Sequence, residues 1–377
     1  MLIRHIDLFC GVGGFRIGIQ NACKKHQAEY QCVFSSDIKK VACEVYKENF
    51  GEYPSGDITQ IEAKDVPDCE VLSGGFPCQA FSHLGIRKGL EDTRGTLIFE
   101  ILRIAKEKRP RFLFLENVKG LADHDGGKTW EIMQNAIEEI GYHFKAEILN
   151  SLYYGSAQHR QRIFIICFRD REDYERFYHP LPTTLPGDFK TIEDILSPKD
   201  TVIQNYKGFY KKEILDGLCY GYNRFPISRK THSSTITTTP ADFFFSDDIP
   251  IETLKENDIP YPVGVRIFND RELARLQGFP EDFKLPKKQI ECWEIFGNSV
   301  TVNVIEAIFD NILKVMEGKQ CAFYEPRMQE RMICKTPLTI DEQRKRISIL
   351  EDLGYGPDGA NKLSKIDPNN LELFLKD

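Results

Sequence analysis

Two side chains suited to covalent and acid–base chemistry each follow an apolar stretch. Cys78 stands in Gly74-Gly75-Phe76-Pro77-Cys78-Gln79, after the apolar segment 70–73, and Glu116 directly follows the run 112–115. Both stretches are typical of buried strands, and the carboxyl ends of parallel strands face the crevice where ligands bind. We therefore expect an accessible thiol nucleophile and a carboxyl group at one sheet edge. An inert cysteine and a helix-capping or ion-paired glutamate are the ordinary alternatives.

A pair of arginines precedes a third apolar run, at 163–168. In the extended segment Gln158-His159-Arg160-Gln161-Arg162, alternate residues point to the same side. Gln158, Arg160 and Arg162 should therefore share one face, and His159 should point away in a structural role. Two guanidinium groups aimed into a crevice suit an anion or a carbonyl-rich base, whereas most surface arginines are simply solvated.

The N-terminal part of the chain carries a signature of a nucleotide-type cofactor. A strand-like segment at 3–9 is followed by Gly11-Val12-Gly13-Gly14 and a helical pattern, so that backbone amides can approach a ligand closely. Asp37 ends the second predicted strand, where an acid can hold ribose hydroxyls. Asp57 follows in Gly56-Asp57-Ile58-Thr59, although such an aspartate is more often a helix cap than a ligand.

The elements that must position these residues alternate along the first half of the chain. This alternation predicts βαβ units and a parallel sheet, an α/β fold. Weak periodicity from 171 to about 266 predicts a separate irregular domain. Helical patterns return at 271–276 and 300–315, and a capping box at Thr339 opens a further helix to Leu350. The other predicted strands are 31–35, 70–73, 112–115 and 163–168, and the other predicted helices are 14–25, 41–49, 97–106 and 130–140.

Composition excludes several classes of protein. The 377 residues are 41% hydrophobic and 28% charged, which is ordinary for a folded protein of two or three domains. No apolar run reaches the roughly 18 residues of a membrane span, and an early acid argues against a signal peptide. Eleven cysteines without a C-x-x-C pair argue against a disulfide framework and a zinc module, and favour a reduced cytoplasmic compartment. A net charge of −7 means that a nucleic acid would need a local basic patch.

Six motifs in a fixed order carry a resemblance to a known family. From about residue 4 to 310 the chain resembles the DNA (cytosine-5) methyltransferases of the bacterial type II modification class. The motifs are Asp7-Leu8-Phe9-Cys10-Gly11-Val12-Gly13-Gly14-Phe15, Pro77-Cys78-Gln79, Glu116-Asn117-Val118, Gln158-x-Arg160-x-Arg162, Arg271-Glu272-x-x-Arg275-x-Gln277-Gly278-Phe279-Pro280 and Gly297-Asn298-Ser299-Val300.

The resemblance implies a domain arrangement. A Rossmann-like, S-adenosylmethionine-dependent methyltransferase sheet would occupy residues 1–185, and a smaller, irregular target-recognition domain 186–280. Residues 281–320 would return to the catalytic domain. The tail 321–377 matches no family motif, and we predict a helical segment of unknown role.

The resemblance also implies a reaction and its residues. Cys78 would add to C6 of a cytosine flipped out of the DNA duplex, with Glu116 at N3 and the exocyclic amine, Arg162 at O2, and Arg160 nearby. Ser82 would reach the flipped nucleotide, and Arg94 and Thr237 would contact DNA. The residues implied for S-adenosylmethionine are Phe15, Gly11 and Gly13 at the methionine part, Asp37 at the ribose, Asp57 and Ile58 at the adenine, Pro77 and Leu97 at the border of the catalytic loop, and Asn298 and Val300 from the C-terminal return.

Two other readings stay open on the sequence alone. An RNA methyltransferase of the tRNA-modifying branch would share the fold, although the Cys-Phe-Thr element usual in that branch is missing. A non-catalytic DNA reader would have no use for intact Cys78, Glu116, Arg160 and Arg162. We expect a monomer with duplex DNA as its partner, a possible cognate restriction endonuclease acting on the same site, no membrane and no metal.

A basic patch in the predicted recognition domain is the expected DNA contact. Residues 201–240 hold six Lys or Arg against two acids, a local charge of +4, and hydroxyls at 233–239 suit phosphate contacts. We assign phosphate contacts to Lys211, Lys212, Arg229 and Lys230, whereas Arg224, beside an aromatic residue, would read a guanine edge.

Replacing Lys211, Lys212, Arg229 and Lys230 together by Gln should flatten the dependence of log affinity on log salt. Each lost phosphate contact removes about 0.9 from the slope, so the change should reach about 3–4. A salt titration of DNA affinity checks this, with S-adenosylmethionine binding unchanged as the control. A slope equal to wild type would mean that the DNA lies elsewhere.

Overall fold

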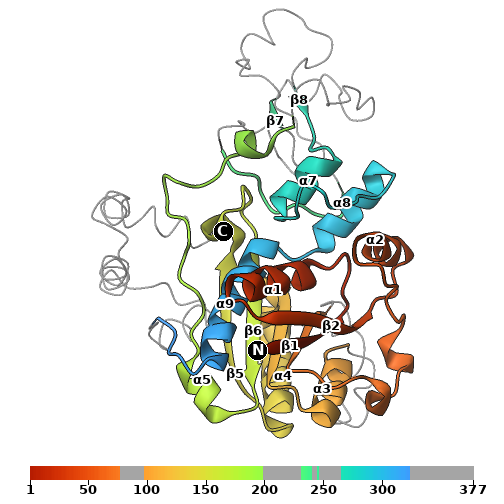
Figure 1. Ribbon diagram of the computed structural model, residues 1–377. Helices are drawn as coiled ribbons and strands as arrows, with labels where there is room; N and C mark the ends of the chain where they lie inside the picture. The colour runs from red at the N-terminus through yellow and green to blue at the C-terminus, as the bar shows by residue number, and fades with distance from the viewer. Residues whose placement is uncertain (77–96, 198–230, 240–243, 246–264, 323–377) are drawn as a thin grey trace, which may run out of the picture.

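The computed structural model describes residues 1–76, 97–197, 231–239, 244–245 and 265–322. At its centre is a six-stranded sheet with the order β2-β1-β3-β4-β6-β5 (Figure 1). Its strands are β1 (Leu2–Leu8), β2 (Glu29–Ser36), β3 (Val71–Gly75), β4 (Phe112–Val118), β5 (His143–Asn150) and β6 (Gln161–Phe168). A separate two-stranded sheet pairs β7 (Phe244–Phe245) with β8 (Val265–Arg266).

The sheet is mixed, so the prediction of a parallel sheet is only partly right. Strands β2, β1, β3 and β4 are parallel, as predicted, but β6 runs antiparallel to both β4 and β5. Strand β5 escaped prediction because Lys145 and Glu147 interrupt its apolar residues. As a result, the short connection from β5 brings the first residues of β6 to the edge where β3 and β4 end.

Helices cover both faces of this sheet. On one face α1 (Gly14–Lys25) packs against α9 (Val302–Met316), and a Cβ at Gly18 would lie 2.7 Å from Ile305, so only glycine permits this approach. On the other face α3 (Leu97–Lys108) and α4 (Lys128–Glu139) bury apolar stripes that include Ile101 and Met133 (Figure 1). Most core residues of these four helices lie in predicted helices, at the spacing that a buried helix face requires.

The remaining helical elements are shorter and lie in the connections between these strands and helices. They are α2 (Lys40–Phe50), α5 (Arg171–Arg176), α7 (Asp270–Leu276), α8 (Gln289–Asn298) and the short 3₁₀ turns η1 (Ile58–Gln60), η2 (Ala63–Asp65), η5 (Lys119–Gly127), η6 (Ser151–Tyr154) and η7 (Ile192–Ile195). Helix α8 was not predicted. No helix in the described ranges is long and apolar enough to cross a membrane.

One hydrophobic cluster joins the predicted catalytic and recognition regions. It contains Val12 and Val45 from the N-terminal part, Ile236 and Phe268 from the predicted recognition domain, and Trp293 from α8. The described pieces of 186–280 therefore share a core with the catalytic sheet's helices. The domain division stays a prediction. The predicted helix ending at Leu350 falls within 323–377, outside the described residues.

A buried chain of hydrogen bonds crosses the strands beneath the glycine loop. The His5 ring nitrogens lie 2.9 Å from the Tyr30 hydroxyl and 2.7 Å from the Ser73 hydroxyl, and Ser73 donates to Asp7 Oδ1 at 3.1 Å. Asp7 Oδ2 is buried without a hydrogen-bond partner. Burial raises the pKa of Asp7 to about 8 and lowers the pKa of His5 to about 3, so both groups are favoured in their neutral forms.

Folding stability should therefore fall as pH rises from about 6.5 to 8. In this window the folded chain keeps a proton on Asp7 that the unfolded chain has already released. Unfolded His5 completes its own deprotonation at the start of the window, and this contribution is the same in Asp7→Asn. Relative to Asp7→Asn, the wild type should lose up to about 1.4 kcal/mol of stability per pH unit. Denaturant unfolding of both proteins across this range measures the difference, and a gap independent of pH would contradict it.

Candidate active site

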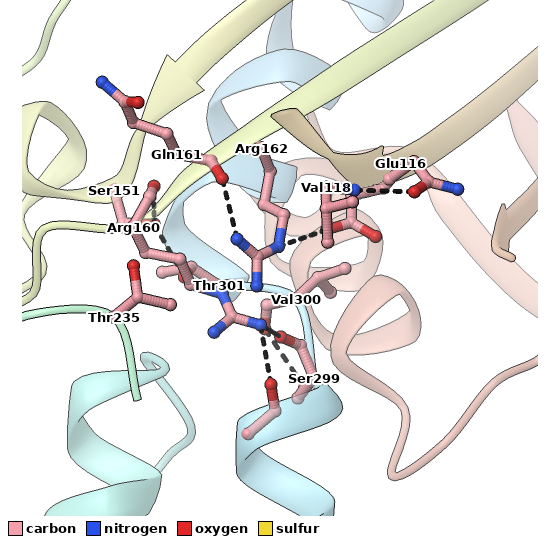
Figure 2. A network of polar contacts seen from close by, with 12 residues as sticks. Glu116, Val118, Ser151, Arg160, Gln161, Arg162, Thr235, Ser299, Val300 and Thr301 are labelled. Atoms are coloured by element: carbon pink, nitrogen blue, oxygen red, sulfur yellow. Dashed lines mark hydrogen bonds and ion pairs between the residues drawn. The ribbon is translucent and has the colours of Figure 1, made fainter. Parts of the chain in front are cut away.

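An ion pair links the ends of two neighbouring strands at the carboxyl edge of the sheet. Glu116 lies near the end of β4 and Arg162 is the second residue of β6, with Val118 as its direct cross-strand partner. Arg162 Nε lies 3.2 Å from Glu116 Oε1, and the two side chains are 16% and 11% exposed (Figure 2). Glu116 thus lies at the carboxyl edge, where the sequence places it, and the antiparallel direction of β6 brings Arg162 to the same edge. The catalytic roles of both residues stay a prediction.

The surroundings of this pair adjust its acid–base behaviour. Burial raises the pKa of the Glu116 carboxyl, while the positive charges of Arg162 and Arg160 oppose that rise. A raised pKa makes the protonated form of this carboxyl group easier to reach, as a proton donor requires. Arg162 Nη1 donates to Gln161 O at 2.8 Å, and within the described part of the chain its Nη2 makes no hydrogen bond. This donor is therefore available to a carbonyl oxygen.

The segment that leads to Cys78 starts directly beside Glu116. Gly75 is the cross-strand partner of Glu116, and a Cβ at Gly75 would lie 3.3 Å from Glu116 Oε2. Asn117 Nδ2 donates to Phe76 O at 2.8 Å, which fixes the last described residue before the loop. The predicted site residues Cys78, Pro77, Ser82 and Arg94 lie outside the described residues.

Arg160 donates its hydrogen bonds to backbone carbonyls, whereas a catalytic arginine would keep its donors for the substrate. Its Nη1 donates to Ile236 O at 3.1 Å, and its Nη2 donates to Gly297 O at 3.0 Å and Ser299 O at 2.7 Å. Figure 2 shows its guanidinium group below that of Arg162, on the shared side that the alternation predicts. Both Nη atoms of Arg160 thus donate to backbone carbonyls, and its predicted catalytic role stays a prediction.

The loops after β1 and β2 are held together by backbone and carboxylate contacts. Cys10 N donates to Ser36 O at 3.0 Å, and Asp37 accepts from Gly11 N through Oδ2 and from Lys39 N through Oδ1, each at 2.8 Å. Gly11 has a φ of +53°, and no atom lies within 4 Å of the position that a Cβ would take. The glycine loop is therefore an open cradle of the kind that a nucleotide-type ligand fills.

The segment carrying Asp57 lies beside the end of β2, because Ser55 N donates to Ser35 O at 2.8 Å. Asp57 caps η1 by accepting from Thr59 N at 3.0 Å and from Thr59 Oγ1 at 2.8 Å. The capping role that the sequence offers as the alternative is thus present, and it involves only Oδ1. Ile38, directly after Asp37, is 74% exposed, an unusual state for a large apolar side chain that sequence reasoning missed.

The other predicted cofactor residues differ in their burial and in the residues that they contact. Phe15 is buried against Phe114, with ring centroids 5.0 Å apart. Val300 packs so closely on Gly14 that a Cβ there would lie 2.7 Å from it. Ile58 is buried in the core, Leu97 is half-buried at the start of α3, and Asn298 is exposed at the end of α8.

The described part of the predicted DNA-binding region runs along the residues that precede β6. Ser233 Oγ donates to Ser234 O and Thr235 Oγ1 to His159 O, each at 2.8 Å. The structure therefore does not support phosphate contacts by these two hydroxyls. Thr237 is exposed, but its hydroxyl likewise donates to a backbone carbonyl, Thr239 O, at 2.9 Å. His159 stacks on His232 with centroids 6.2 Å apart. The predicted contacts Lys211, Lys212, Arg224, Arg229 and Lys230 lie outside the described residues.

Gln277 is a structural residue of the site whose partners the sequence did not reveal. Its Oε1 accepts from Thr301 Oγ1 and its Nε2 donates to Phe296 O, each at 2.8 Å, and the side chain is fully buried. These bonds fix the turn between α8 and α9. The only sequence signal is its place in the motif Arg275-x-Gln277-Gly278.

This fold and this edge define an α/β enzyme of the methyltransferase class, and comparison with known proteins assigns its family. A family model described as C-5 cytosine-specific DNA methylase matches residues 3–314. The chain is 41% identical over 325 residues to type II methyltransferase M1.ScrFI of Lactococcus lactis subsp. cremoris, covering 83% of this chain and 79% of that protein. It is 36% identical to type II methyltransferase M.HhaI of Haemophilus parahaemolyticus, covering 82% and 94%. The chain therefore belongs to the C-5 cytosine-specific DNA methylase family.

Solved structures support the same fold. The S. pombe Dnmt2 methyltransferase aligns with a TM-score of 0.66 at 22% identity, covering 83% of this chain and 99% of that one. A putative DNA modification methyltransferase encoded within an E. coli prophage gives a TM-score of 0.61 at 19% identity, covering 84% and 99%. The resemblance that the sequence motifs indicate is thus confirmed. The chain is a DNA cytosine-5 methyltransferase, and its relatives are type II methyltransferases of restriction-modification systems.

Asp37→Ala and Asp57→Ala should each weaken S-adenosylmethionine binding by about tenfold to over a hundredfold, through loss of a charge-assisted hydrogen bond of roughly 1.5–3 kcal/mol. Asp37→Ala should have the larger effect, because it also releases Gly11 N. Calorimetric titration measures the affinity, and Asp65→Ala on η2 is the charge-matched control. Wild-type affinity in both folded variants would refute the assignment.

Proposed function

We propose that this chain methylates C5 of a flipped-out cytosine in a specific duplex DNA sequence through a covalent adduct between Cys78 and C6. The observation that carries the proposal is the buried Glu116–Arg162 pair, 3.2 Å apart, beside Gly75 and Phe76. Cys78 follows Phe76 by only two residues in the sequence. This closeness in the chain supports a site made of the nucleophile, the acid and the donor to a carbonyl.

The chemistry needs these three groups because C5 of neutral cytosine is a poor nucleophile. The Cys78 thiolate forms a bond to C6, and the electron pair of the C5–C6 double bond moves toward N3, where the Glu116 carboxyl supplies a proton. Arg162 Nη2 donates to O2 and stabilises the charge that gathers there. The raised pKa of Glu116 suits this proton donation. C5 then takes the methyl group, N3 returns its proton to Glu116, and a base removes the proton from C5. The electron pair of that C–H bond re-forms the C5–C6 double bond as the C6–S bond breaks and the Cys78 thiolate leaves.

S-adenosylmethionine is the methyl donor of this family, and the residues of the cradle fit it. The open position at Gly11 suits the methionine part, with Phe15 as the floor. Asp37 would hold the ribose, and Asp57, whose Oδ2 is not used in capping, would hold the adenine amine. The exposed Ile38 offers an apolar surface to the adenine ring. When bound, this group supplies an electrophilic methyl group on a sulfonium.

The target duplex requires further residues to hold it. We assign the phosphate contacts to Lys211, Lys212, Arg229 and Lys230, base reading to Arg224, and further contacts to Ser82, Arg94 and Thr237. A monomer suffices for this arrangement. The curated relatives are named type II methyltransferases, which supports a cognate restriction endonuclease as a partner in the bacterial cytoplasm.

Cys78→Ser should abolish methyl transfer while leaving duplex binding within about threefold, because affinity comes mostly from phosphates and base edges. A bisulfite map of DNA from cells expressing the chain identifies the target. A duplex with 5-fluorocytosine at that position should then trap the wild type covalently, since fluorine cannot leave as a proton does.

Cys32→Ser is the matched control, because a hydroxyl can keep the contacts of Cys32 with Phe34 O and the Tyr46 hydroxyl. This variant should be trapped like the wild type. Trapping of Cys78→Ser, or none of the wild type on its mapped site, would sink the covalent mechanism. Transfer to tRNA instead of duplex DNA would contradict the substrate.

A further inference from the structure

Arg160 is a buried cation whose partners are neutral. The side chain is 2% exposed, and within the described residues it forms no ion pair. Its hydrogen bonds go to three backbone carbonyls, and its Nε is buried without a partner. Burying a charge with no counter-ion in contact is costly. Local stability alone therefore does not explain why an arginine is buried at this position.

The three carbonyls belong to two segments that are far apart in the chain. Ile236 lies in residues 231–239, which we call the recognition segment because it is the described part of the predicted recognition domain that contacts β6. Gly297 and Ser299 lie in residues 297–301, which we call the return loop. One guanidinium group thus joins both segments, 76 residues and 137 residues from Arg160. Figure 2 shows its bond to Ser299.

The recognition segment is fastened to the residues before β6 through its backbone. Ser233 N donates to Ala157 O and His159 N donates to Ser233 O, each at 2.8 Å. Ile236 N donates to Gln158 Oε1 at 3.0 Å. If the recognition segment moves when DNA binds, its hydrogen bonds with Arg160 and with the residues before β6 must therefore change.

The return loop reaches the cofactor cradle from the other side. A Cβ at Gly14 would lie 2.7 Å from the Val300 side chain and 3.0 Å from Ser299 Oγ. The two segments also touch each other, since a Cβ at Gly297 would lie 2.4 Å from the carbonyl carbon and oxygen of Thr237. A short path of contacts thus runs from the recognition segment through the return loop to the cradle. Arg160 donates hydrogen bonds to the recognition segment and to the return loop.

We propose that Arg160 is a positioning residue that couples the seating of target DNA on the recognition segment to cofactor binding at the return loop. The inference rests on the proposed function. A planar guanidinium group suits this task because its donors point in fixed directions to separate acceptors. By reciprocity, each ligand then raises the affinity for the other by the same factor.

The experiment measures the affinity for S-adenosylhomocysteine, the demethylated product, with and without the mapped target duplex. In the wild type the duplex should raise this affinity by about 5- to 150-fold, the usual range of coupling between sites. Arg160→Met should bring the ratio to about 1, since it keeps the bulk and removes every donor. Arg160→Lys should give an intermediate ratio, because an ammonium group can reach some of the carbonyls.

Two controls separate coupling from other losses. Arg275→Met removes an arginine that also holds a recognition-side carbonyl, Ile195 O at 3.0 Å, without touching the return loop, and it should keep the wild-type ratio. Arg162→Lys should lower kcat and keep the ratio, as expected for a group that acts on the base. Gly297→Ala pushes the return loop away from Thr237 and disturbs the bond from Arg160 to Gly297 O, while the Arg160 side chain itself stays unchanged. This variant should also lower the ratio, and it tests the inference if Arg160→Met does not fold.

Several results would overturn the inference. A wild type whose two ligands bind independently would do so, as would unchanged ratios in both Arg160→Lys and Gly297→Ala. A lowered kcat in Arg160→Lys with an intact ratio would return Arg160 to the catalytic residues. Failure of the proposed function is separate, because it would show as a wild type that methylates no cytosine.

Discussion

The antiparallel pairing of β6 with β4 brings a cationic segment to the edge where the parallel strands end. Because β6 starts at that edge, Arg162 lies across from Val118 and within 3.2 Å of Glu116. In a wholly parallel sheet, residues preceding this strand would lie at the opposite edge, far from Glu116. Glu116, Arg162 and the last described residues before Cys78 meet because one strand is reversed.

The sequence predicts the first four strands well because each is an apolar run bounded by glycine or a charge. It places Glu116 correctly, since a carboxylate directly after such a run must lie at the strand end. It misses β5, where Lys145 and Glu147 break the apolar pattern, and hence the reversal of β6. It also misses the partners of Arg160, because these are backbone carbonyls of Ile236 and Gly297, which no side-chain pattern marks.

The two acids predicted to hold the cofactor already have structural roles, which leave room for a binding role. Sequence reasoning treats capping and ligand binding as alternatives for Asp57, but a carboxylate has two oxygens, and capping of η1 uses one. Asp37 divides its oxygens between Gly11 N and Lys39 N, so the same side chain shapes the glycine loop. Buried Asp7 lies beneath the same loop, without a partner for Oδ2. The cradle is thus built from polar groups whose removal affects shape and affinity together.

The attachment of the recognition segment depends mainly on main-chain atoms. Arg160 and Gln158 bind the carbonyl and amide of Ile236, and Gly297 packs on the carbonyl of Thr237. Every amino acid presents these groups, so exposed side chains of the segment can change while these backbone bonds persist, as long as buried Ile236 keeps its place in the core. Related enzymes would then vary the exposed residues of this segment and keep the same catalytic frame. New DNA specificities would in this way arise by substitution at the surface rather than by rebuilding the active site.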